Sequence, residues 1–254
     1  MRILISNDDG IHAEGIQVLA AYLAKVSEVF VAAPERERSA TGHGITMHKP
    51  LRICEVKMKY YDAIGWGVSG TPADCVKLAV EELMPAPPDV IVSGINCGAN
   101  VGTDILYSGT VSAAIEGTIA EYKSVAVSLD TERDCPDFES AAEFTSRLVE
   151  TYYRHKTPND ILLNINIPDL PWEDIKGVQV TKLSSRKYVD SVERRHDPRG
   201  RPYFWLAGQI DDRGCQANSD AAALKEKKIS ITPVHFDLTK YDIIEDLSQW
   251  NITK

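Results

Sequence analysis

The sequence has few long apolar runs, and this scarcity excludes several classes of membrane and secreted protein. No run approaches the roughly 20 apolar residues of a membrane-spanning helix. Only three apolar residues separate Arg2 from Ser6, which is too short for the core of a signal peptide. We therefore expect a cytoplasmic protein that does not associate with membranes.

The cysteines lack the spacing of a structural framework. There are five, an odd number, and none forms a CxxC pair; they are Cys54, Cys75, Cys97, Cys135 and Cys215. This pattern argues against a set of disulfides and against a zinc knuckle, and it fits a reducing compartment.

Basic residues are also scarce. Lysine and arginine number 28 against 37 acids, for a net charge of -9, so the overall field repels nucleic acid and anionic lipid. The glycine fingerprints GxGxxG, after the first strand, and GxxxxGK[ST] are absent. A small anion would need local help from a metal ion or from backbone amides.

What the sequence does contain is a regular alternation of strand-like and helix-like segments. Separate strands joined by helix-length segments predict βαβ units, hence an α/β fold with a mostly parallel sheet whose ligands bind beyond the carboxyl ends of the strands. The predicted strands are 3–5, 29–33, 90–92, 125–129 and 161–167, and the predicted helices are 16–26, 72–83, 111–119 and 138–152.

The composition of the chain changes near Lys182, after which the segments are polar and rich in residues that favour β-strands. A turn at 197–200 predicts a protruding hairpin. We therefore divide the chain into an α/β domain, 1–181, and a segment that contains the hairpin arm and the C-terminal residues, 182–254. Acids interleave with the arm's bases, which favours a solvated or subunit-facing hairpin over a nucleic-acid surface. These bases are Arg186, Lys187, Arg194, Arg195, Arg199 and Arg201.

Two adjacent carboxylates, Asp8 and Asp9, end the first predicted strand. Like charges side by side are unfavourable unless a cation or proton offsets them, which predicts a divalent metal. Ser39 and Asn96 follow later strands and should lie at the same sheet edge. Together they form an all-oxygen set that suits Mg²⁺ or Mn²⁺ and disfavours zinc. The simpler alternatives are a solvated turn for the acids, a turn or cap for Ser39 and a loop-bonding amide for Asn96.

Two further segments are candidates for contact with substrate. Ser108-Gly109-Thr110 begins a helix, where free N–H groups and the helix dipole attract an anion; the alternative is an ordinary cap. His43 lies between Gly42 and Gly44 in the loop of Ser39, so it is a candidate for proton transfer or substrate contact, or else for loop hydrogen bonding.

Together these motifs resemble the SurE survival-protein family. The resemblance rests on NDDG, APERERSATGHGIT, SGTPADCV and SGINCGANVGTDILYSGTVSAAIEG, and on ISITPVHFDLT near the C-terminus. It implies a Rossmann-like three-layer αβα sandwich with a C-terminal β-hairpin arm and tail, and a homodimer or homotetramer formed through the arm. It also implies one Mg²⁺ or Mn²⁺ per subunit, held by Asp8, Asp9, Ser39 and Asn96, and a phosphate held in part by Ser108, Gly109 and Thr110.

The expected activity is hydrolysis of nucleoside 5′- and possibly 3′-monophosphates by a metal-activated water, with Asp8, Asp9 and Asn96 catalytic. Contacts to phosphate and substrate are expected from Ser39, Gly42, His43, Asn96 and 108–110. Direct attack by Asp8 or Asp9 is an alternative route. A non-catalytic nucleotide-binding regulator is the alternative function. The preferred base and the position of the phosphate stay open.

Overall fold

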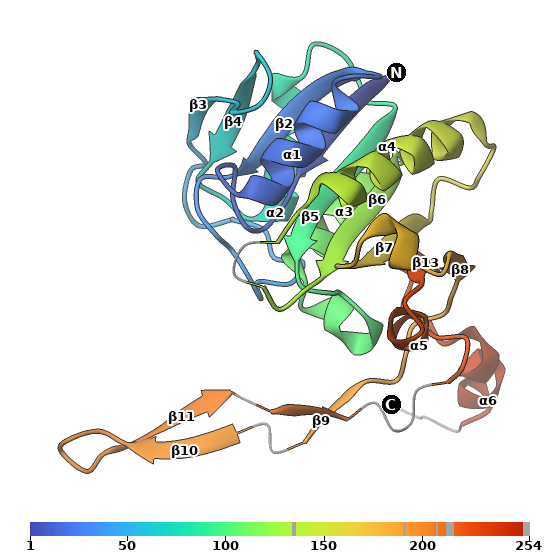
Figure 1. The fold of residues 1–254 in the computed structure, drawn as a ribbon. Helices are drawn as coiled ribbons and strands as arrows, with labels where there is room; N and C mark the ends of the chain where they lie inside the picture. The colour runs from blue at the N-terminus through green and yellow to red at the C-terminus, as the bar shows by residue number, and fades with distance from the viewer. Residues whose placement is uncertain (134–135, 190–191, 207, 212–215, 251–254) are drawn as a thin grey trace.

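A nine-stranded sheet forms the centre of the computed structural model, which describes residues 1–133, 136–189, 192–206, 208–211 and 216–250 (Figure 1). The strand order is β3-β4-β2-β1-β5-β6-β7-β13-β8. The strands are β1 (Arg2–Ser6), β2 (Glu28–Pro34), β3 (Ile53–Lys57), β4 (Ile64–Val68), β5 (Val90–Cys97), β6 (Lys123–Asp130), β7 (Leu162–Pro168), β8 (Val178–Val180) and β13 (Ile229–Val234). All five strands expected from the sequence are present.

The middle of the sheet is parallel, as predicted. Strands β4, β2, β1, β5, β6 and β7 run in one direction, with Ile3 of β1 paired to Val29 on one side and Val90 on the other. Strand β3 is antiparallel to β4, and β13 is antiparallel to β7. The carboxyl ends of β1, β2 and β5 therefore meet at one edge, which places the loops that follow them together.

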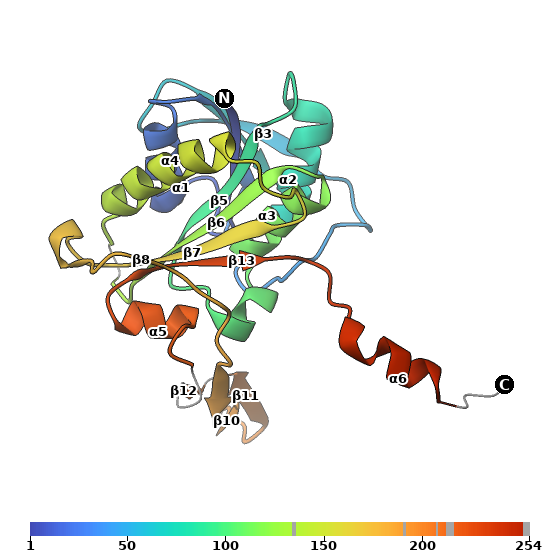
Figure 2. The same cartoon turned by 90° about the vertical axis from the view of Figure 1, so that its right-hand side faces the viewer.

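Helices cover both faces of the sheet, so the expected three-layer αβα fold is confirmed (Figure 2). Helices α1 (Glu14–Leu23) and α4 (Glu139–Arg154) pack together on one face, and α2 (Pro72–Leu78) and α3 (Gly109–Ile119) on the other. Alternate residues of β1 pack against the two helical layers, because successive side chains of a strand point to opposite faces. Ile3 and Ile5 join the core under α1 and α4, and Leu4 joins the core under α2 and α3.

The expected hairpin arm is also present. It consists of two antiparallel pairs that project from the body, β10 (Val192–His196) with β11 (Pro202–Leu206) and β9 (Lys187–Val189) with β12 (Gln209–Asp211) (Figure 1). Local ion pairs neutralise bases of the arm, such as Arg195 with Glu193 at 2.8 Å and Arg201 with Asp197 at 2.8 Å. This pairing agrees with a solvated or subunit-facing hairpin.

The segment after Lys182 does not stay in the arm. Helix α5 (Asp220–Lys225) leads into β13, which lies between β7 and β8 in the main sheet. Helix α6 (Ile244–Ser248) then extends away from the body (Figure 2). The division into segments 1–181 and 182–254 stays a prediction. In the structure, β13 of the second segment forms part of the main sheet. The β3–β4 hairpin lies in a part of the chain for which no strand was predicted.

Three of the five cysteines, Cys54, Cys75 and Cys97, are free thiols, while Cys135 and Cys215 lie outside the described residues. Across the described ranges, no helix combines the length and the apolar composition that crossing a membrane requires.

The start of α2 is capped by the side chains of Thr71 and Asp74. Thr71 accepts a hydrogen bond from Asp74 N at 3.1 Å, Asp74 Oδ2 accepts one from Thr71 N at 2.8 Å, and Pro72 occupies the first turn. The hydroxyl of Thr71 also donates to Gly44 O at 2.7 Å, which ties the loop after Ser39 to α2.

We expect Thr71→Ala to lower the free energy of unfolding by about 1 kcal/mol, because the N-cap bond is lost. Thr71→Ser, which keeps the hydroxyl, is the matched control and should stay close to the wild type. Urea denaturation measures both. Equal stability of the alanine variant and the wild type would contradict this role of the cap.

Candidate metal and phosphate site

A cleft of about 440 Å³ lies beyond the carboxyl ends of β1 and β5. It brings together the four residues predicted as metal ligands, Asp8, Asp9, Ser39 and Asn96, together with Ser108 at the start of α3. Its other lining residues are Glu37, Ala40, Cys97, Asn100, Asp104 and Tyr107. Residues up to 100 positions apart in the chain thus converge as the parallel topology predicts.

The turn after β1 is fixed by Asn7 and Gly10. The buried side chain of Asn7 donates to Gly10 O at 3.0 Å and accepts from Gly10 N at 3.1 Å. Gly10 has a φ of +99°, and a Cβ there would lie 3.1 Å from the backbone of Arg36. Glycine is therefore required both for the backbone conformation and for the close passage of the loop after β2. These contacts fix the direction in which Asp8 and Asp9 leave the strand.

Asp8 lies under the first turn of α3. Its side chain accepts a hydrogen bond from the hydroxyl of Thr110, and a Cβ on Gly109 would lie 2.6 Å from Asp8 Cβ. Burial raises the pKa of Asp8, while hydrogen bonds from the Thr110 hydroxyl and from the amides of Thr110 and Gly109 oppose the rise. The positive end of the helix therefore stabilises the charge of a protein carboxylate.

Asp9 is half-buried beside Asp8. Burial, and then the charges of Asp8 and Glu37, raise the pKa of Asp9 to about 6, although a hydrogen bond from the backbone of Cys97 opposes this. The cleft thus gathers negative charge that its protein groups do not neutralise. A bound cation would relieve this repulsion.

Ser39 and Asn96 add neutral oxygens to the two carboxylates. The amide nitrogen of Asn96 donates to Gly98 O at 2.7 Å, which holds the side chain and leaves its oxygen as the atom suited to a cation. The hydroxyl of Ser39 donates to Glu37 Oε1 at 2.7 Å. This donor set of carboxylate, hydroxyl and amide oxygens fits a hard divalent cation. Among the described residues, no group of three or more His, Cys, Asp and Glu side chains is placed to hold a metal, so the neutral oxygens are essential to this fit.

Four of the predicted substrate residues, Gly42, His43, Gly109 and Thr110, lie outside the lining of the cleft. His43 Nε2 lies 2.8 Å from Glu116 Oε2 of α3, and His43 lines a separate cavity of about 620 Å³ that also contacts Phe236 and Leu238. Gly109 and Thr110 are buried, and their polar groups contact Asp8. Ser108 lines the cleft, but its hydroxyl also caps α3 by accepting from Val111 N at 3.1 Å.

Gly42 has a different position from His43. Its N–H donates to Tyr107 O at 3.1 Å, and its φ is +57°. This bond fastens the loop of Ser39 to the segment before α3, so Gly42 supports the wall of the cleft through its backbone.

Buried side-chain amides, which the sequence analysis did not single out, hold the other wall of the cleft. Asn100 N donates to Asn166 Oδ1 at 2.7 Å, and Asn100 O accepts from Asn164 Nδ2 at 2.9 Å and from Asn166 Nδ2 at 3.0 Å. Both asparagines are fully buried on β7. Their spacing of two residues on one strand is a signal for a shared face, but it does not reveal the partner loop.

Asp104 and Glu37 are further acids that the sequence analysis did not single out. Asp104 Oδ2 lies 3.1 Å from Arg186 Nη1 at the base of the arm, and both side chains are largely buried. The pair therefore joins the cleft wall to the arm.

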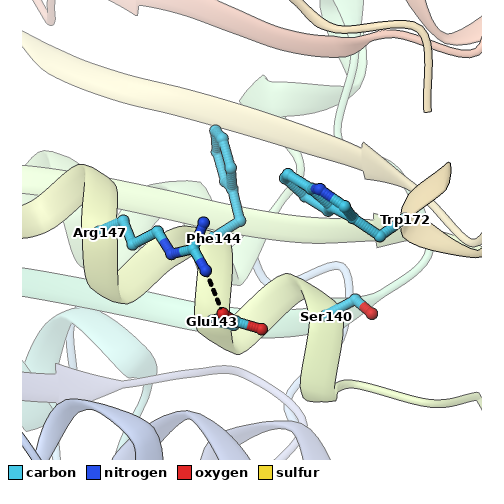
Figure 3. Close-up of a pocket in the computed structure, with 5 residues that line it drawn as sticks. All are labelled: Ser140, Glu143, Phe144, Arg147 and Trp172. Carbon is cyan, nitrogen blue, oxygen red and sulfur yellow. Dashed lines mark hydrogen bonds and ion pairs between the residues drawn. The ribbon is translucent and has the colours of Figure 1, made fainter.

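A smaller hollow of about 200 Å³ lies on α4, away from these residues. Figure 3 shows Phe144 beside Trp172, with ring centroids 6.1 Å apart, and Arg147 joined to Glu143. Its one acid, Glu143, is paired with Arg147, so it does not compete with the cleft as the candidate site.

Comparison with known proteins gives the same family as the sequence motifs. The family model for survival protein SurE matches residues 3–190. The chain belongs to the SurE family. A SurE protein of Heliobacterium modesticaldum, described as a 5′-nucleotidase, is 51% identical over 98% of this chain and 92% of its own length. One of Moorella thermoacetica with the same description is 52% identical over 98% and 96%. The crystal structure of the SurE protein from Aquifex aeolicus superposes with a TM-score of 0.86, at 37% identity and 98% coverage of both chains.

We expect Gly109→Ala to lower the free energy of unfolding by about 1–3 kcal/mol, because the added methyl group overlaps Asp8. Gly44→Ala is the matched control, since its Cβ would meet only Thr41 O at an ordinary 3.6 Å. Chemical denaturation of both variants tests the contact. If the two variants lose the same stability, the close approach of α3 to Asp8 is wrong.

Proposed function

We propose that this chain is a metal-dependent 5′-nucleotidase that hydrolyses nucleoside monophosphates to nucleoside and phosphate. The observation that carries the proposal is the cleft in which Asp8, Asp9, Ser39 and Asn96 meet. Relatives described as 5′-nucleotidases, at about 50% identity over nearly the whole chain, support the same reaction. The non-catalytic alternative has no comparable support.

In this proposal Asp8, Asp9, Ser39 and Asn96 hold one Mg²⁺ or Mn²⁺. When bound, the cation supplies Lewis-acid stabilisation of phosphoryl oxygens and lowers the pKa of water. Asn96 and Asp8 are oriented before substrate arrives, Asn96 by Gly98 and Asp8 by Thr110. Such preorganisation lowers the reorganisation that the reaction requires. Ser108 lies at the end of the cleft next to α3, where we place the phosphate.

Water is a better nucleophile than Asp8 in this geometry. Attack by the Asp8 carboxylate would require it to leave the Thr110 hydroxyl and the amides at the start of α3. Water has no such contacts to break. In the proposed reaction water forms the new bond to phosphorus, the bond from phosphorus to the nucleoside oxygen breaks, and that oxygen takes up the proton that water loses. Attack by Asp9 stays the alternative covalent route.

We expect AMP plus Mn²⁺ to give phosphate release that EDTA abolishes, because the oxygen ligands of the cleft need a cation to bind a phosphate dianion. Release is measured by a colorimetric phosphate assay over several divalent metals and nucleotides. Absence of release under all of these conditions would falsify the enzymatic function.

We expect Asp8→Asn to abolish this activity and to weaken Mn²⁺ binding at least about tenfold, because a charged ligand becomes neutral while its shape is kept. Asp62→Asn, on a carboxylate that is 99% exposed, is the charge-matched control. Titration calorimetry measures the metal affinity independently of turnover. Undiminished Mn²⁺ affinity in Asp8→Asn would overturn the assignment of this ligand.

We propose that the arm and tail form contacts between copies of the chain in a homodimer or homotetramer. The supporting observation is the exposure of large apolar side chains there, which is unfavourable for a monomer. They include Tyr203, Phe204, Trp205 and Leu206 on β11 and Leu247 and Trp250 near α6. A cytoplasmic location stays a prediction.

A further inference from the structure

The cleft has a polar floor but an aromatic side chain at its edge. Among the described residues that line it, Tyr107 is the one aromatic. Its side chain is 67% exposed, and the aromatic and cation contacts found in the described ranges do not include it. A large ring is therefore presented to whatever enters the cleft.

The backbone of Tyr107 is fixed although its side chain is exposed. Its N–H donates to Asp104 O at 3.0 Å at the end of the short helix η2 (Gly102–Leu106), and its carbonyl accepts from Gly42 N at 3.1 Å. Contacts from both sides hold this position between η2 and α3. A ring on a fixed backbone has only its own rotamers to lose when a ligand covers it, which favours its use in binding.

The position of Tyr107 also matches the shape of the proposed substrate. Tyr107 directly precedes Ser108, and Thr110 in the next turn contacts Asp8. A phosphate near Ser108 and the acid pair would leave its nucleoside directed out of the polar floor. Ala40 also lines the cleft, and the Gly42–Tyr107 hydrogen bond joins the loop of Ala40 to Tyr107.

We propose that Tyr107 is the nucleobase platform of this site, on which the base of a nucleoside monophosphate stacks while its phosphate lies at the acid pair. This inference rests on the proposed nucleotidase function and adds to it a residue that discriminates nucleotides from other phosphomonoesters. Stacking uses the face of a ring, which every base possesses, so it predicts broad acceptance of bases rather than selection of one.

The test compares AMP with ribose 5-phosphate, which has the same sugar and phosphate but no base. We expect Tyr107→Ala to lower kcat/KM for AMP about 5- to 100-fold, mainly through KM, because stacking on the ring is lost. The value for ribose 5-phosphate should change less than about twofold. Tyr107→Phe should restore the preference for AMP, since the ring and not the hydroxyl is required.

Tyr153→Ala is the matched control, because Tyr153 is an exposed tyrosine on α4 outside the cleft lining. An equal loss for AMP and ribose 5-phosphate in Tyr107→Ala, or no loss for either, would overturn the platform. A changed oligomeric state in Tyr107→Ala with an unchanged preference for AMP over ribose 5-phosphate would also overturn the platform, because it would assign the ring to a contact between copies.

Equilibrium binding separates this inference from the proposed reaction. Calorimetric titration of the phosphonate analogue of AMP, in which a CH₂ group replaces the ester oxygen that hydrolysis would release, and of inorganic phosphate, each with Mn²⁺, reports on the ring without turnover. Weaker binding of the analogue with unchanged phosphate binding in Tyr107→Ala supports the platform even if hydrolysis of AMP is absent. Unchanged binding of the analogue overturns it even if hydrolysis of AMP is present.

Discussion

The packing of α3 on Asp8 is the constraint on which the site depends. A helix end and a carboxylate meet without an intervening side chain, because residue 109 is glycine. This contact fixes the acid pair relative to α3, and the segment before α3 carries Asp104, Tyr107 and Ser108 into the same cleft. The loop of Ser39 is in turn bonded to Tyr107 O through Gly42 N and to Asp8 O through Arg38 N at 2.7 Å. The loop of Ser39 and the segment before α3 therefore have one common support.

The same contact changes the role of the helix start. Ser108-Gly109-Thr110 has the sequence of an anion site, and the anion that it holds in the structure is a side chain of the protein. Gly109 and Thr110 hold a carboxylate in place, and that carboxylate can then face a cation. In the proposed function the phosphate therefore binds toward the cation and the Ser108 end of the cleft, while the helix dipole stabilises the negative charge of Asp8.

Periodicity was sufficient to predict strands β1, β2, β5, β6 and β7 and the helices that cover them, because these features depend on local sequence, whereas the edge strands β3 and β8 were not predicted. The meeting of Asp8, Asp9, Ser39 and Asn96 was predictable because parallel strands bring their carboxyl ends to one edge. The position of His43 was not, since its partner Glu116 is 73 residues away and nothing in the sequence links them. Two further features depend likewise on contacts between distant parts of the sequence. Strand β13 inserts between β7 and β8, and Asn164 and Asn166 hydrogen-bond to Asn100.

The route from β8 to its parallel neighbour β13 contains the whole arm. The two ends of the arm segment are joined at its base, here called the root, where Lys182 forms a β-bridge with Ser219. The buried Asp220 also accepts hydrogen bonds there from Ser184 N at 2.9 Å and from Gly102 N at 2.8 Å. Once such a root is closed, each doubling of the chain beyond it adds only about 0.6 kcal/mol to the entropic cost. Insertions and deletions beyond the root are therefore inexpensive for the sheet, so the arm is free to diverge in length during evolution while the cleft is preserved.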